Sequence, residues 1–291
     1  MNGYYQFISP VIFLVSGRDS KRYLQARLSN DITNLNILDS VNAGCLSPQG
    51  KTESILKVTK LDDNKYLLVC LSGKSDQVIS TLKKFLVADR VDITDLTQDY
   101  NLYYFNFHNL DFLSSNLPCT KDQNFFIFHN DYNTNGCLAV LKKYPEVALE
   151  DQTLGINRLN ENDFSLLRIK AKMPEFNFEI IEDSLFVEAL RFDCISNTKG
   201  CYAGQEVVER TLALGKPPFN ILSFYIDYRL NISTNCNILI GGSGDVVGKV
   251  LNSAYSDNEK RTYLFTKIKY KFKSLELNIS VAEKKYYLVP F

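Results

Sequence analysis

The stretch Lys199-Gly200-Cys201-Tyr202-Ala203-Gly204-Gln205-Glu206 combines a cation, a thiol, two glycines, an amide and a carboxylate. This mixture is too polar for a buried strand, and its glycines weaken a helix interior. The residues that follow predict a helix over 204–214, so Cys201 is expected just before a helix N-terminus. Such a position, with Lys199 nearby, favours the thiolate. Cys201 is thus a candidate nucleophile, redox thiol or metal ligand, and the alternative is a half-buried cysteine in a tight packing turn.

The chain before this stretch mixes strand and helix patterns, which predicts an α+β arrangement. Residues 75–88 give the clearest helix, with Ser75 as its cap and an apolar stripe that includes Val78 and Leu82. The other predicted helices are 20–28 and 162–173. The predicted strands are 6–15, 52–61, 65–71, 91–96, 101–107, 125–128 and 137–141.

After Pro218 no helical period appears, and the chain reads as a small all-β domain that we expect to form a barrel. Lysines alternate strictly with apolar or aromatic residues over 267–273, which indicates a strand with one solvent-exposed and one buried face. The predicted strands here are 220–228, 237–240, 246–252, 261–268 and 284–289. We therefore divide the chain into residues 1–217 and 218–291.

Composition and charge exclude several classes of function. The 33 basic and 33 acidic residues among 291 balance, which argues against a broad nucleic-acid surface. No apolar run reaches the length of a spanning helix, and the N-terminus lacks a signal-peptide pattern, so we expect a cytoplasmic protein without membrane contact. The seven cysteines show no C-x-x-C pair, and His108 and His129 lack ligands at metal spacing, so no self-contained metal site is expected.

Two glycine-rich stretches resemble nucleotide-binding loops but fail on spacing. Residues 44–52 have one residue too many for a phosphate loop and lead into a strand, so a strand–turn–strand is predicted there. Residues 242–248 have their last glycine one residue late for a dinucleotide fingerprint and are better explained as a hairpin turn. Neither stretch is therefore a candidate functional site, and Cys201 stays the candidate.

The stretch Lys199–Glu206, followed by Arg210, resembles the signature of the YgfZ family, folate-binding-fold proteins related to the aminomethyltransferase (T-protein) of the glycine cleavage system. Weaker similarities extend over most of the chain, at 17–31, 47–51, 168–176 and 248–253. The resemblance implies two α+β modules of the aminomethyltransferase (GcvT-like) type and a C-terminal antiparallel β-barrel, packed into a ring-like body around a central cavity.

The resemblance also implies a function. Cys201 would be the signature thiol beside a cavity for tetrahydrofolate, and the protein would support assembly or repair of iron–sulfur enzymes and, through them, tRNA thiolation. Its partners would be those enzymes or cluster-assembly proteins, with no direct nucleic acid, and we expect a monomer. The residues expected to contact the cofactor are Asn30, Asp31, Lys199, Tyr202, Gln205, Glu206 and Arg210.

One position departs from the relatives. The aminomethyltransferases hold the pterin with a glutamate where this chain has Lys170, and a cation cannot accept the N–H donors of a pterin. Two alternatives therefore stay open. The first is a true tetrahydrofolate-dependent one-carbon transferase, and the second is a non-catalytic scaffold for a partner protein.

Overall fold

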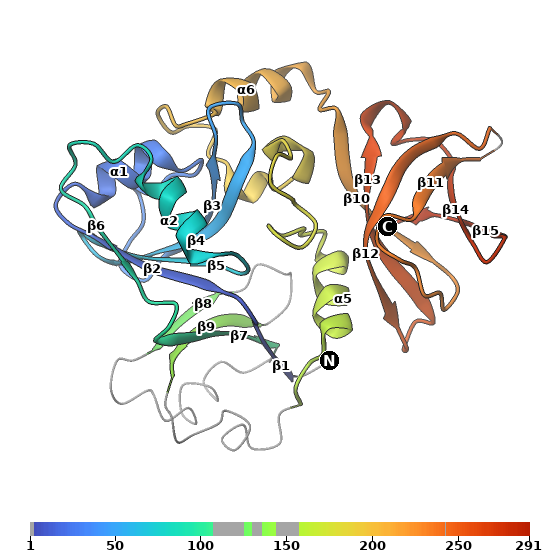
Figure 1. Ribbon diagram of the computed structural model, residues 1–291, viewed down its shortest axis with the longest axis horizontal. Coiled ribbons are helices and arrows are strands. Elements are labelled where there is room, and N and C mark those ends of the chain that lie inside the picture. Colours follow the sequence, from blue (N-terminus) through green and yellow to red (C-terminus); the bar gives the residue numbers. More distant parts are fainter. Residues whose placement is uncertain (1–2, 107–124, 130–135, 144–156, 242) are drawn as a thin grey trace.

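The computed structural model describes residues 3–106, 125–129, 136–143, 157–241 and 243–291. His108, Cys119 and the last residue of the strand predicted over 101–107 lie outside these residues. Figure 1 shows three bodies of sheet: one with α1 and α2, one below it, and the C-terminal sheet on the far side of α5. This is the α+β arrangement with a C-terminal β-body that the sequence predicted.

The N-terminal region contains two antiparallel sheets. The five-stranded sheet has the order β3-β4-β5-β2-β6 and the four-stranded sheet the order β1-β7-β9-β8. The strands of the first are β2 (Val11–Ser16), β3 (Ser40–Leu46), β4 (Thr52–Asp62), β5 (Lys65–Cys70) and β6 (Asp92–Asp95). Those of the second are β1 (Gly3–Gln6), β7 (Tyr100–Asn106), β8 (Phe125–His129) and β9 (Cys137–Lys142).

The strand predicted over 6–15 is wrong in one respect, because the chain there forms two strands in different sheets. β1 pairs with β7, whereas β2 pairs with β5 and β6. Pro10, which has no backbone N–H to donate to a ladder, stands in the break immediately before β2. The short link between β1 and β2 therefore ties the two sheets together.

The helices begin and end close to their predicted positions, except at the C-terminal end of α2. They are α1 (Ser20–Arg27), α2 (Ser75–Lys83), α5 (Glu161–Ala171) and α6 (Gln205–Leu214). Asn160 caps α5 through a capping box with Asp163. α2 begins at Ser75 as predicted, but its N-cap is Lys74 rather than Ser75, and the helix ends five residues earlier than predicted.

The C-terminal sheet has the order β15-β14-β11-β12-β13-β10-β16. Its two edge strands, β15 and β16, are consecutive in the chain with only Leu288 between them, so the sheet must curl until its edges nearly meet. The result is the barrel-like body that the sequence predicted. Its strands are β10 (Phe219–Ile226), β11 (Asn237–Ile240), β12 (Val246–Ser256), β13 (Arg261–Lys269), β14 (Leu277–Val281), β15 (Lys284–Tyr287) and β16 (Val289–Pro290).

Two details of this body differ from the prediction. The alternating stretch 267–273 is not one strand, because β13 ends at Lys269 and the 3-10 helix η4 (Tyr270–Phe272) follows. β14 has no counterpart among the predicted strands. The division of the chain at residues 217 and 218 stays a prediction, and β10 begins at Phe219.

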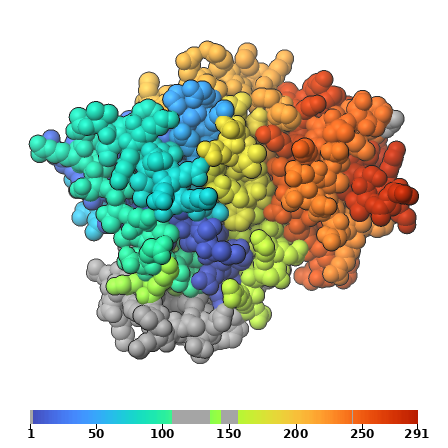
Figure 2. Space-filling view, in the orientation of Figure 1, coloured from blue at the N-terminus to red at the C-terminus, as the bar shows by residue number. Residues whose placement is uncertain are grey.

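A connecting segment between α5 and α6 fills the space between the sheets. It carries the 3-10 helices η2 (Phe186–Ala189) and η3 (Phe192–Cys194). Figure 2 shows its first part, in yellow, lying between the N-terminal region and the barrel. Phe186 and Val187 of this segment share one buried cluster with Ile221 and Phe265 of the barrel, so the two regions have a common core.

A buried ion pair joins this segment to α5 and to the barrel. Arg168 of α5 and Glu179 are both fully buried, 2.5 Å apart, and the guanidinium of Arg168 lies 4.3 Å from the centre of the Phe178 ring. Asn252 of β12 donates to the second oxygen of Glu179 at 2.7 Å. Because a buried carboxylate is stable only when its oxygens are paired, this network fixes the barrel against α5.

Candidate functional site

Cys201 is exposed, whereas its neighbour Tyr202 is 6% exposed. A Cβ added to Gly200 would meet no atom within 4 Å, so the backbone beside the thiol also faces open space. Burial raises the pKa of Tyr202 to about 12, with a smaller contribution from the charge of Glu209. The chain therefore buries the side chain of Tyr202 and leaves the adjacent thiol of Cys201 exposed.

Lys199 is held by the end of α1. Its Nζ donates to the backbone carbonyls of Gln25, at 2.5 Å, Leu28 and Asn30, at 3.1 Å, and it lies 5.2 Å from the centre of the Tyr202 ring. A helix leaves its last carbonyls without intrahelical partners, and a cation there also complements the helix dipole. Burial lowers the pKa of Lys199 to about 8, while the charge of Asp31 opposes this shift. From the sequence we expected Lys199 to lie near the thiol of Cys201. In the structure its amino group instead bonds to backbone carbonyls at the end of α1.

Gly204 is required by close contact with another turn. Its φ of 82° lies in the left-handed region, and an added Cβ would come within 2.4 Å of Ser47 O. Gly50, with φ 72°, faces it in return, because its Cβ would meet the side chain of Val207 at 2.8 Å. The predicted strand–turn–strand over 44–52 is the β3–β4 hairpin, and its turn is the surface on which the start of α6 rests.

The first residues of α6 divide into inner and outer ones. The side-chain oxygen of Gln205 accepts from the backbone N–H of Tyr202 at 3.3 Å and so closes the turn before the helix. Glu206 pairs with Arg210 at 2.6 Å, and both side chains are largely exposed. The carboxylate of Glu206 therefore pairs with Arg210 and not with Lys199, whose amino group bonds to backbone carbonyls.

Asn30 and Asp31 lie after α1 and bond to protein groups. The Asn30 amide donates to the carbonyls of Asn42 and Asp193, both at 2.8 Å, and so joins β3 to η3. Asp31 accepts hydrogen bonds from Thr33 and from Asn34. Burial raises the pKa of Asp31, but these hydrogen bonds more than offset it and hold the pKa below its usual value. The structure thus brings Asn30 and Lys199 together, while Glu206 and Arg210 form a separate surface pair.

Cys201 opens into a cleft of about 520 Å³ beside α1. Arg18, Lys21, Arg22 and Gln25 line one wall at helical spacing, and Gly200 and Cys201 contribute to the lining. Arg22 is paired with Asp89, and Arg18 lies 3.6 Å from Asp19. These cationic residues were not among the predicted site residues. The spacing of the three cations at positions 18, 21 and 22 is the signal that could have found them.

The other described cysteines lie in different surroundings. Cys45, Cys70, Cys137 and Cys194 are buried, and Cys236 is half-buried. Burial raises the pKa of Cys45 to about 11 and of Cys70 and Cys137 to about 12. Burial also raises the pKa of Cys194, and because the thiolate is the reactive form, the four buried thiols are poor nucleophiles. Among the residues that the structure describes, Cys201 is the exposed cysteine.

Lys170 of α5, where the resemblance implies a glutamate, faces the barrel. Its Nζ is 2.8 Å from a carboxylate oxygen of Glu259 and 4.9 Å from the centre of the Tyr263 ring. Tyr263 donates a hydrogen bond to the same carboxylate, and these bonds hold the pKa of Glu259 below its usual value. A cation engaged in this way does not fit the glutamate-based binding of a pterin.

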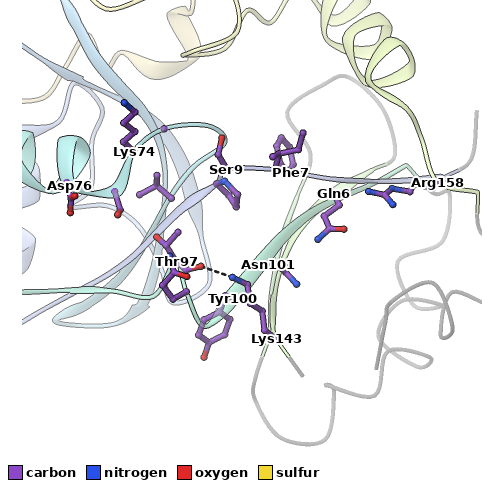
Figure 3. A pocket seen from close by; sticks show the side chains of 16 residues that line it. Gln6, Phe7, Ser9, Lys74, Asp76, Thr97, Tyr100, Asn101, Lys143 and Arg158 are labelled. Carbon is purple, nitrogen blue, oxygen red and sulfur yellow. Dashed lines mark hydrogen bonds between the residues drawn. The ribbon is translucent and has the colours of Figure 1, made fainter. Parts of the chain in front are cut away.

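Figure 3 shows a second cleft, of about 730 Å³, between the two N-terminal sheets. Ser9, Lys74 and Asn101 are among its lining residues, and Lys143 donates to the backbone carbonyl of Thr97 at 3.2 Å. None of the residues predicted for the Cys201 site lines it. The cleft is therefore separate from the signature segment.

Two features are absent from the residues that the structure describes. No group of three or more His, Cys, Asp or Glu side chains in this part of the chain could hold a metal ion. Within the same residues, no helix has the length and apolar character needed to cross a membrane.

Comparisons with known proteins bear on the fold. No family model matches the chain. Over 99% of its length it superposes on the glycine cleavage system aminomethyltransferase T from Bartonella henselae, covering 84% of that chain with a TM-score of 0.86 at 17% identity. The chain has the YgfZ/GcvT-like fold. The resemblance noted in the sequence and the fold class it implied are both confirmed.

Sequence relatives point to the same YgfZ/GcvT-like group. One is the "Iron-sulfur cluster assembly factor IBA57 homolog, mitochondrial" of Mycosarcoma maydis, 26% identical over 229 residues, which are 73% of this chain and 55% of that protein. Another is the "tRNA-modifying protein YgfZ" of Aliivibrio fischeri, 25% identical over 212 residues, or 67% of this chain and 62% of that protein. The matched region thus spans less than two thirds of each of these relatives.

Proposed function

We propose that this protein supports the assembly or repair of iron–sulfur enzymes through Cys201, and through those enzymes the thiolation of tRNA. The names of the IBA57 and YgfZ relatives support the cellular role. The observation that carries it is the presentation of Cys201. Lys199, Tyr202 and Gly204 are fixed by contacts with α1 and the β3–β4 hairpin, while the thiol between them faces solvent.

In this proposal Cys201 acts in contact with a second protein. Iron–sulfur clusters are usually held by four cysteine thiolates, and no second exposed cysteine accompanies Cys201 among the described residues. Cys201 would therefore supply one thiolate, and an iron–sulfur enzyme or a cluster-assembly protein would supply the remaining ligands. We further propose that the protein is a cytoplasmic monomer that contacts neither nucleic acid nor membrane directly.

The test replaces single thiols in cells that lack the native protein. Cys201→Ser should lower the activity of iron–sulfur enzymes and the level of thiolated tRNA while the variant accumulates normally. Cys236→Ser, which changes a half-buried cysteine on the barrel, is the matched control and should behave like the wild type. Normal enzyme activity in cells with stable Cys201→Ser protein would refute the proposal.

A tetrahydrofolate-dependent aminomethyl or one-carbon transferase is the second candidate, favoured by the superposition on an aminomethyltransferase. Lys170 and its ion pair with Glu259 count against it, because they replace the carboxylate that would hold the pterin. A ligand selective for the folded state raises the melting temperature, so tetrahydrofolate should do so if it binds. An unchanged melting temperature at millimolar tetrahydrofolate would remove this candidate.

The exposure of Cys201 counts against the other alternative, a non-catalytic scaffold in which the thiol only packs.

A further inference from the structure

A mostly apolar cavity of about 300 Å³ lies where the end of α6 meets the barrel. It is separate from the Cys201 cleft, with which it shares no lining residue. Its apolar walls are Val187, Leu190, Phe192, Leu212, Pro217 and Leu222. Small-molecule sites are typically concave and apolar, with a few polar groups that fix the orientation of the ligand.

Asn220 supplies such a polar group. It lies on β10, lines the cavity and is 4% exposed. Its side-chain oxygen has no hydrogen-bond partner among the described residues. Because the atom without a partner is the side-chain oxygen, Asn220 can offer an acceptor to a ligand in the cavity. A buried amide without a partner is costly, and a ligand with an N–H donor would remove that cost.

Lys273 supplies a positive charge to the same cavity. It follows η4, lines the cavity, and its Nζ lies 4.0 Å from the centre of the Tyr270 ring, which is also part of the lining. Lys273 forms no ion pair within the described part of the chain. The cavity thus combines apolar walls, aromatic rings, one buried amide and one unpaired cation.

We propose that this cavity binds a small aromatic carboxylate that carries an N–H donor. The ring fills the apolar space beside Phe192 and Tyr270, the N–H donates to the Asn220 amide, and the carboxylate pairs with Lys273. Because α6 and β10 both contribute to the walls, an occupied cavity links the helix of the signature segment to the barrel. This inference does not depend on the proposed role of Cys201.

The probe is indole-3-acetate, which has the ring, the donor and the carboxylate. For a ligand of this size we expect a Kd of about 0.1–1 mM by calorimetry or ligand-observed NMR. Methylation of the indole nitrogen removes the donor and should weaken binding by about tenfold, the effect of one hydrogen bond. Asn220→Leu should weaken indole-3-acetate equally but leave the methylated probe unaffected. Lys273→Met should weaken indole-3-acetate and not plain indole.

Asn278→Leu is the matched control. Asn278 is also a buried barrel asparagine whose side-chain oxygen lacks a partner among the described residues, but it does not line the cavity. This variant should bind indole-3-acetate like the wild type. The proposal is overturned if no saturable binding occurs up to about 10 mM, well beyond the expected Kd. It is also overturned if Asn220→Leu and Asn278→Leu bind the probe equally well.

Discussion

Two successive segments, Arg191–Cys194 and Lys199–Glu206, each contain a cation, a carboxylate and a cysteine, yet they put the thiol in opposite places. In the first, Arg191 forms ion pairs with Glu175 at 2.7 Å and Asp193 at 2.9 Å, and the Cys194 thiol beside them is fully buried. In the second, Lys199 bonds to the end of α1, and Cys201 is left exposed. The two cations thus have different partners, because Arg191 pairs with carboxylates, one of them in its own segment, whereas Lys199 bonds to backbone carbonyls near the end of α1.

Arg191→Met should have the largest effect on stability. It leaves Glu175, which is almost completely buried, without the Arg191 cation, and breaking such a pair costs about 3–5 kcal/mol of unfolding free energy. Urea denaturation measures the loss. Arg210→Met, which breaks an exposed pair in the second segment, should cost less than about 1 kcal/mol. Equal losses in the two variants would contradict the distinction between the segments.

Gly204→Ala should follow, with a loss of about 2–4 kcal/mol from left-handed strain and from the clash with Ser47 O. Gly200→Ala changes the other glycine of the same segment, where the added methyl meets no atom, and should stay within about 0.5 kcal/mol of the wild type. Thermal unfolding of both variants gives the comparison. A tolerated Gly204→Ala would mean that the β3–β4 turn does not hold the start of α6.

Lys199→Met should cost about 1–3 kcal/mol near pH 7, because it leaves carbonyls at the end of α1 without a donor. The cost should also depend on pH. The folded pKa of about 8 lies below the unfolded value of 10.5, so between these values the unfolded chain binds more protons and the wild type gains stability as pH rises. The variant lacks this gain, so the difference between the two proteins should widen from pH 8 to 10.5. A difference that stays constant or narrows would contradict the burial of the amino group.

Glu206→Gln should have the smallest effect. It breaks the exposed i,i+4 pair with Arg210, which is worth about 0.3–0.5 kcal/mol. Denaturation at low and high salt measures this loss, which should vanish at high salt because exposed pairs are screened. A salt-independent loss above about 1 kcal/mol would show that Glu206 has a partner beyond Arg210.

Local patterns predicted most of the fold. The apolar stripe of α2 and the alternating strands of the barrel are patterns of residues close together in the sequence. The predictions failed where strand pairing sets the ends of a strand. At Pro10 one predicted strand is divided between two sheets. After Lys269 the alternating pattern continues, but the strand ends and a 3-10 helix follows.

The candidate site was predictable only in part. The signature identified Cys201 and the helix after it, because glycines and a cysteine before a helix form a local pattern. The bonds from Lys199 to Gln25 and Asn30, and the contact between Gly204 and Ser47, join residues more than 150 positions apart along the chain. No spacing rule records such contacts. The sequence therefore suggested that Lys199 is a neighbour of the thiol, whereas its amino group is bonded to the end of α1.

Residue-resolved thiol labelling of the folded protein tests the central claim most directly. Iodoacetamide is added under native conditions, and mass spectrometry follows each cysteine with time. Because a buried thiol reacts only after local opening and the Cys194 pKa is raised by burial, Cys201 should react at least about 100-fold faster than Cys194. It should also react faster than Cys236. Labelling of Cys194 as fast as Cys201 would show that the two segments do not differ in presenting their thiols, and the account of Cys201 as the functional thiol would fail.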